Sequence, residues 1–238
     1  MYKKISHNIV EEHFDHPAAM PDHMIKPTMS PLTGGGAIQP LPPAVMTDTT
    51  MTFRMDSRTL WTRYALGMIN FSVSDFGNLA STDNVKNSLA RNAAAIGNFF
   101  TPYYGFTTGD KITGLLNALT KNGEKVVEVV KSGNTDVEVY MDIWAQQSMA
   151  LADYLNQINP NNYPKDLLAD MFIQLTKFWL EDFMARYNKD FAADAVALDN
   201  ILKIGVTGVP DHSKAGYSSI ADVLSRGIVA QFPLLFIE

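Results

Sequence analysis

The sequence contains no cysteine among its 238 residues. This absence excludes disulfide bonds, thiolate metal sites and a cysteine nucleophile. Charged residues are also scarce, at 18%, whereas apolar residues make up 46%. An apolar fraction this high excludes a disordered chain, and so few charges are unusual for a free-standing domain. We therefore expect another molecule to cover part of the surface.

Long apolar runs are missing as well. No stretch approaches the roughly 20 consecutive apolar residues of a membrane-spanning helix, and residues 1–7 lack the apolar run of a signal peptide. The net charge of −6 and the isoelectric point of about 5.3 have the wrong sign for a protein that grips phosphate backbones. These absences predict an intracellular or virion protein with no membrane span and no nucleic-acid partner.

Histidine is missing from most of the chain, since positions 24 to 211 hold none. A di-iron carboxylate bundle needs Glu-x-x-His pairs on facing helices, so the sequence excludes that class. Near the N-terminus, His13 and His16 could offer two imidazoles to a transition metal. Their spacing matches no closed zinc pattern. The sequence therefore predicts no metal site, and His13 and His16 are its candidate ligands if one exists.

Residues 1–53 have the composition of an extended arm. Seven prolines and the run Gly34-Gly35-Gly36 interrupt any helix or central strand there. A flexible linker is one interpretation. The other is an arm that wraps a neighbouring subunit, which the excess of apolar over charged residues favours. Its predicted partner-binding residues are Met20, Met24, Ile25, Met29, Leu32, Ile38, Leu41, Val45 and Met46.

From Asp56 onward the pattern is helical, with apolar residues at three- and four-residue steps and Asp, Ser, Thr, Pro and Gly at the boundaries. Helices are predicted to begin near residues 56, 81, 108, 135, 164, 191 and 218, with a loop over residues 205–216. Because sustained two-residue alternation is absent, we expect almost no sheet. The predicted fold class is all-α: a bundle of about six or seven helices over residues 54–233, with the arm before it and an apolar tail, residues 234–238, after it.

Three details of this pattern predict how the helices pack. Tyr64, Met68 and Phe71 share one face of the first helix and belong in a core. Gly123 lies inside a helical pattern, which indicates a close helix crossing or a break. Seven-residue spacing, typical of a bundle seam, joins Val137, Trp144, Leu151 and Ile158.

Candidate catalytic residues are few. Arg58 and Arg63 are expected to form salt bridges with helix acids, with contact to an anion or a partner as the alternative. Asp211-His212-Ser213 are adjacent residues that cannot converge on one substrate atom, and no Gly-x-Ser-x-Gly elbow exists. The following acids are expected on solvated helix faces: Asp142, Asp153, Asp166, Asp170, Glu181 and Asp182. We therefore predict no catalytic residue, no cofactor and no enzyme activity.

Several landmarks resemble, in order and spacing, a group of small bacterial all-helical proteins that are often labelled acetylglutamate kinase. The likeness covers residues 55–233. It rests on Leu60-Trp61-Thr62-Arg63, Phe100-Thr101-Pro102-Tyr103-Tyr104-Gly105, Ile158-Asn159-Pro160, Leu175-Thr176, Phe191-Ala192-Ala193-Asp194 and Arg226-Gly227-Ile228-Val229-Ala230-Gln231-Phe232-Pro233. The resemblance implies a helical fold, and the kinase label has no motif behind it in this chain.

The chain departs from that family at the residues that would carry chemistry. Family members have a histidine three residues before the Trp-Thr-Arg tryptophan, where this chain has Arg58, and another before the Leu-Thr pair, where it has Phe172. A third lies in the sixth helix near Leu202, and residues 205–216 look inserted. The resemblance therefore implies the family's fold without its activity.

These observations predict a non-enzymatic structural or assembly protein, for example a virion or minor capsid component, that binds neighbouring subunits, with a homo-oligomer as one form. The C-terminal tail either folds back on the bundle or docks into a partner, and Leu234, Leu235 and Phe236 are its predicted partner-binding residues. The alternative function is a metal-binding bundle or a small-ligand binder, with an apolar cavity among Trp61, Trp144 and Trp179.

Overall fold

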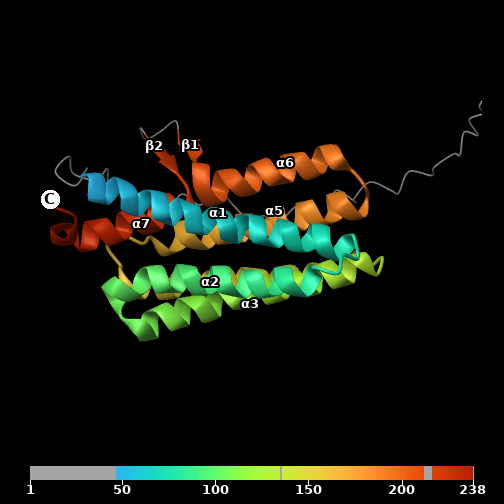
Figure 1. Ribbon diagram of the computed structural model, residues 1–238, viewed down its shortest axis with the longest axis horizontal. Helices are drawn as coiled ribbons and strands as arrows, with labels where there is room; N and C mark the ends of the chain where they lie inside the picture. Colours follow the sequence, from blue (N-terminus) through green and yellow to red (C-terminus); the bar gives the residue numbers. More distant parts are fainter. Residues whose placement is uncertain (1–46, 135, 212–215, 238) are drawn as a thin grey trace, which may run out of the picture. The chain divides into compact units, whose positions relative to one another are not determined.

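The computed structural model describes residues 47–134, 136–211 and 216–237. The described chain forms seven α-helices that lie as a bundle (Figure 1). They are α1 (Asp48–Phe76), α2 (Thr82–Tyr104), α3 (Phe106–Lys131), α4 (Glu138–Ile158), α5 (Lys165–Tyr187), α6 (Phe191–Leu202) and α7 (Ile220–Gln231). The predicted all-α fold class is confirmed.

Helix α1 lies at the centre of the bundle, because it contacts α2, α3, α5, α6 and α7. Its spacing of large apolar residues explains this position. Tyr64, Met68 and Phe71 are at most 1% exposed, as the three- and four-residue steps predict. Tyr64 also donates a hydrogen bond from its hydroxyl to the Leu116 carbonyl oxygen of α3, at 2.9 Å. The buried phenol is therefore satisfied, and it ties α1 to α3.

An aromatic series continues from α1 into the core. Trp61 contacts the rings of Phe172 and Tyr64, Tyr64 contacts Trp179, and Trp179 contacts Trp144, with centroids 5.6 to 6.3 Å apart. These separations are typical of packed aromatic pairs. Trp144 and Trp179 are fully buried, and the Trp144 indole N–H donates to the Leu119 carbonyl oxygen at 2.8 Å. The three tryptophans are linked through this series of ring contacts.

Gly123 marks a close helix crossing, which was one of the two predicted roles. Helix α3 continues through it without a break. A Cβ at this position would come within 2.5 Å of the Met68 Cε of α1 and 3.1 Å of the Trp144 ring of α4. A side chain here would therefore require the end of Met68 and the Trp144 ring to shift, so glycine suits this close approach of α1 and α4 to α3.

Two helix starts differ from the prediction. Helix α1 begins at Asp48 rather than Asp56, because Thr47 Oγ1 accepts a hydrogen bond from the Thr50 backbone N–H at 3.1 Å and caps it. Residues 48–53, assigned to the arm from the sequence, are thus helical. Helix α4 begins at Glu138, after the predicted start near residue 135. The Asn134 side chain accepts from the Asp136 N–H at 2.9 Å, and residues 136 and 137 are not helical.

The prediction of a loop over residues 205–216 is wrong in part. A π-helical turn (Lys203–Thr207) extends α6, and β1 (Val209–Asp211) pairs antiparallel with β2 (Gly216–Ser218). The pairing joins Val209 to Ser218. Strands this short have no room for a recognisable two-residue alternation. The chain then enters α7 at Ser219, whose Oγ accepts from the Asp222 N–H at 3.1 Å.

Candidate functional site

The start of α1, the end of α2 and the end of α7 meet at one end of the bundle. Phe53 of α1 stacks on Phe99 of α2, with ring centroids 4.4 Å apart, and lies 5.0 Å from the ring of Phe236. Tyr103 lies 5.9 Å from the same Phe236 ring. Thr47 Oγ1 also donates to the Phe236 carbonyl oxygen at 2.8 Å. The first described residue and the C-terminal tail are therefore neighbours.

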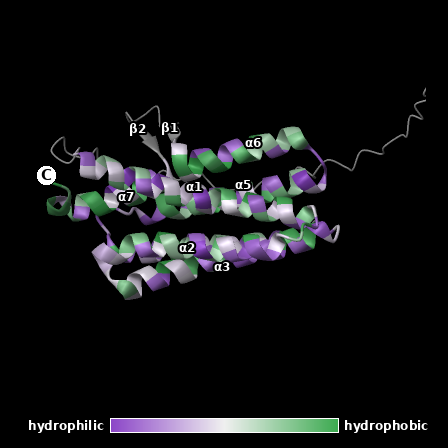
Figure 2. Ribbon diagram, in the orientation of Figure 1, coloured by the Kyte–Doolittle hydropathy of each residue, from purple (hydrophilic) through white to green (hydrophobic). Residues whose placement is uncertain are grey.

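The tail both folds back and exposes apolar residues. A short 3₁₀ helix (Pro233–Phe236) buries Phe236 to 2% exposure, so this residue contributes to the packing of the bundle itself. Leu234 and Leu235 remain 81% and 63% exposed, and Ile237 is 55% exposed. Phe106, the first residue of α3, is 80% exposed. We call Leu234, Leu235 and Ile237 the apolar end, and Figure 2 shows the hydrophobic colour near the C-terminus.

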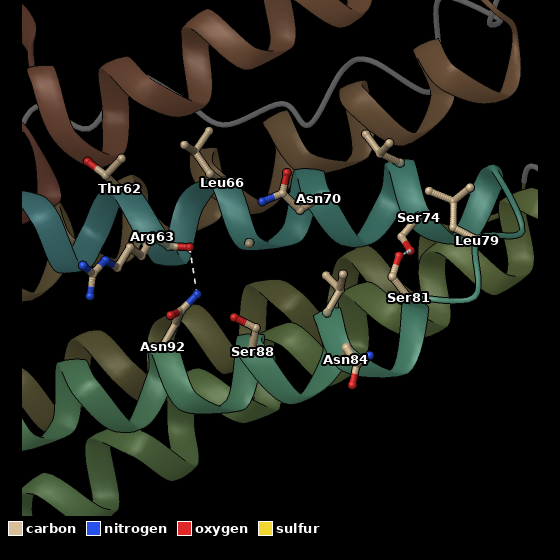
Figure 3. Close-up of a pocket in the computed structure, with 13 residues that line it drawn as sticks. Thr62, Arg63, Leu66, Asn70, Ser74, Leu79, Ser81, Asn84, Ser88 and Asn92 are labelled. Atoms are coloured by element: carbon tan, nitrogen blue, oxygen red, sulfur yellow. Dashed lines mark hydrogen bonds between the residues drawn. The ribbon is translucent and has the colours of Figure 1, made fainter.

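A surface groove lies between α1 and α2 (Figure 3). Its volume is about 730 Å³, within the range of small-ligand sites. Such sites are usually apolar, whereas this lining is rich in uncharged polar side chains. The residues that line it are Thr62, Arg63, Leu66, Gly67, Asn70, Val73, Ser74, Leu79, Ser81, Asn84, Val85, Ser88 and Asn92.

Polar contacts across this groove join the two helices to each other. Asn92 of α2 donates to the Arg63 carbonyl oxygen of α1 at 3.0 Å, and the Ser74 and Thr82 hydroxyls are hydrogen-bonded at 2.9 Å. Within the described residues Arg63 forms no ion pair. The groove therefore offers amides and hydroxyls, with one guanidinium, to any small molecule that enters it.

A cluster of arginines surrounds Asp222 between α1 and α7. The Arg58 guanidinium donates to both oxygens of this carboxylate, from Nε at 3.1 Å and from Nη2 at 2.8 Å. Arg54, one turn earlier, donates from Nη2 at 3.3 Å. The Asp222 side chain is 1% exposed, and its hydrogen bond raises the pKa of Arg58. The salt bridge predicted for Arg58 is confirmed.

A second buried ionic cluster corrects one prediction. Asp182 of α5 was expected on a solvated face, but it is fully buried and accepts a hydrogen bond from the Ser72 hydroxyl of α1 at 2.7 Å. Arg186 contacts both Asp182, at 3.1 Å, and Asp194 of α6, at 2.8 Å. Two acids thus share one guanidinium and tie α6 to α5.

The pKa of Asp182 is raised to about 6. Burial is the largest cause, and the nearby Asp194 carboxyl adds to it. Arg186 and Ser72 oppose the shift, because both donate to the ionised carboxylate. We expect burial to prevail, because a single guanidinium serves two carboxyl groups there.

The other candidate residues show no catalytic arrangement. Asp142 and Asp166 are exposed as predicted, and Asp153 forms a half-exposed pair with Lys165 at 2.6 Å. The described residues contain no cluster of three or more His, Cys, Asp or Glu that could hold a metal ion. Helices long and apolar enough to cross a membrane are likewise absent from the described part of the chain.

Some of the residues weighed in the sequence lie outside the described residues. These are His13, His16 and the arm residues Met20, Met24, Ile25, Met29, Leu32, Ile38, Leu41, Val45 and Met46, together with His212 and Ser213. The candidate ligands His13 and His16 are therefore untested, and the arm contacts stay predictions.

No family model matches this chain, and neither a curated protein nor a solved structure matches it. The resemblance to the bacterial helical family thus stays a prediction. At the positions of that family's histidines, Arg58 pairs with Asp222, whereas Phe172 is 1% exposed against the Trp61 ring, 6.0 Å away. Neither side chain is placed to replace an imidazole as an acid, a base or a metal ligand.

Proposed function

We propose that this chain is a non-enzymatic assembly protein, whose N-terminal arm binds the apolar end of a neighbouring copy. A virion, in which minor proteins hold their neighbours, is one assembly of this kind. The observation that carries the proposal is the exposure of Leu234, Leu235 and Ile237, at 55% or more, next to Phe236, whose carbonyl oxygen accepts from Thr47 at the start of α1. Exposed apolar clusters are typical of protein-binding surfaces.

A second copy is the occupant that the chain itself suggests. The predicted arm is rich in Met, Ile, Leu and Val and poor in charge. Its apolar side chains could therefore pack on the exposed residues of the apolar end. The arm reaches the bundle at Thr47, which is hydrogen-bonded to Phe236 of the tail. Exchange of arms between copies would bury the apolar side chains of the arm and those of the apolar end.

Sedimentation velocity of the full-length chain over a concentration series tests this proposal. We expect the unaltered protein to form a defined oligomer, and the double variant Leu234→Ser, Leu235→Ser to dissociate to monomer. The matched control is Val139→Ser, Val196→Ser, which removes apolar residues of 60% and 59% exposure from α4 and α6. This control should assemble normally, because its positions lie elsewhere on the bundle.

Deletion of residues 1–46 is the second part of the test. We expect the truncated chain to keep its helical circular dichroism and to lose assembly. Assembly that persists without the arm contradicts the proposal. A full-length monomer at every concentration also contradicts it.

A further inference from the structure

The arginine cluster around Asp222 carries more positive charge than its carboxylate can neutralise. Arg54 and Arg58 both pair with this single acid, which leaves an excess of one positive charge. Arg226, one turn further along α7, is close enough that Arg54 and Arg58 lower its pKa, although burial is the larger cause. Asp222 raises the pKa of Arg226.

Most of the hydrogen-bond donors in this cluster are not used by Asp222. A guanidinium has five N–H donors. Arg58 directs its Nε and Nη2 at the carboxylate, and Arg54 directs only one Nη2. The Nε of Arg54 is buried and has no hydrogen-bond partner among the described residues. An incoming anion cannot reach this buried atom, but the Nη1 groups of Arg54 and Arg58 form no hydrogen bond with the described residues and remain for an added acceptor.

The cluster is also open to solvent on one side. The Arg58 side chain is 43% exposed and the Arg54 side chain 22%, whereas Asp222 is 1% exposed. The carboxylate therefore lies at the bottom, and the guanidiniums rise above it from α1. Asp222 fixes both of them through its hydrogen bonds, so an incoming anion meets donors that are already oriented.

We propose that Arg54 and Arg58, held by Asp222, form a binding site for a phosphate group, either free phosphate or a small phosphate ester. A phosphate carries roughly −1.5 to −2 charge near neutral pH and several acceptor oxygens, which suits an uneven charge balance and several forked donors. The site takes one anionic group and needs no nucleic acid, in keeping with the net charge of −6. It lies between α1 and α7, and its test does not depend on assembly.

Two measurements on the full-length chain test this site. Isothermal titration calorimetry measures the affinity for inorganic phosphate and for phenyl phosphate. Thermal unfolding compares the protein in phosphate with the protein in sodium chloride at matched ionic strength. We expect phosphate to raise the unfolding temperature above the chloride value. Arg54→Gln should weaken phosphate binding about tenfold or more, because a hydrogen bond to a charged group contributes that much free energy. Arg54→Lys should keep part of the affinity, because it keeps the charge but loses the fork.

The matched control is Arg91→Gln, which removes an exposed arginine from α2. It should bind phosphate like the unaltered protein, and equal weakening in both variants would overturn the site as an effect of overall charge. Binding of both probes supports a free-anion site, and binding of phenyl phosphate alone supports a phosphate-ester site. If the unaltered protein shows no difference between phosphate and chloride, the proposal fails, whether or not the variants fold.

Discussion

Asp182 gives the bundle a stability that should fall as the pH rises from about 4 to 6. Its pKa is raised from 3.8 to about 6 in the folded chain, with burial as the main cause. As the pH rises, the Asp182 carboxyl therefore loses its proton at a lower pH in the unfolded chain than in the folded chain. The free energy of unfolding falls as a result. The stabilising contribution is complete below pH 3.8 and is lost once the pH exceeds the folded value.

The size of this loss follows from the shift. Each pKa unit corresponds to about 1.4 kcal/mol, so a shift from 3.8 to about 6 removes roughly 3 kcal/mol of unfolding free energy. Asp182→Asn removes the ionisation and keeps a carbonyl oxygen that accepts from Ser72. The unaltered protein should therefore lose roughly 3 kcal/mol relative to this variant between pH 4 and pH 7.

Urea unfolding, followed by circular dichroism at several pH values and constant ionic strength, measures this difference. Subtracting the unfolding free energy of Asp182→Asn from that of the unaltered protein at each pH removes the contribution of the other acids. Ser72→Ala is a second probe, since losing the 2.7 Å hydrogen bond to the carboxylate should move the pH window upward. If the difference is flat, or if the unaltered protein gains stability as the pH rises, then Arg186 keeps Asp182 ionised throughout and the reasoning is refuted.

Two further predictions concern packing and capping. Gly227→Ala should destabilise the bundle by about 1 to 3 kcal/mol in urea unfolding, because its Cβ would lie 2.0 Å from the Tyr163 ring. Its control is Gly114→Ala on α3, where a Cβ meets nothing within 4 Å and should instead stabilise by about 0.5 to 1 kcal/mol. Asp190→Ala should cost about 1 kcal/mol in the same assay, because Asp190 caps α6 by accepting from the Ala193 N–H at 3.0 Å; an unchanged midpoint would mean that water replaces the cap.

The helices of the bundle were predictable because their signals are local. Spacing within α1 identified its buried face, and Asp190 identified the start of α6, since a cap and its helix lie within a few residues of each other. The start of α1 was missed although Thr47 is a suitable cap. The prolines and glycines before it favoured an arm, and nothing local marked where that composition ended.

The ionic clusters could not be located in the same way, because their partners are far apart in sequence. Arg58 and Asp222 are separated by 164 residues, and only the antiparallel packing of α1 on α7 brings them together. Asp182 did carry a signal, since it lies next to Phe183 and one turn after Trp179, two core positions. An acid on that face of α5 has to be buried, and a buried acid requires donors from other helices.

The placement of Asp222 shows how one residue joins the fold to the proposed phosphate site. Its backbone N–H is capped by Ser219 at the start of α7, and its carboxylate fixes Arg54 and Arg58 of α1. A buried carboxylate needs at least one cation, which Arg58 supplies with two hydrogen bonds. The second arginine, Arg54, adds a positive charge beyond the one that the carboxylate needs. An anion bound above the carboxylate would balance that charge.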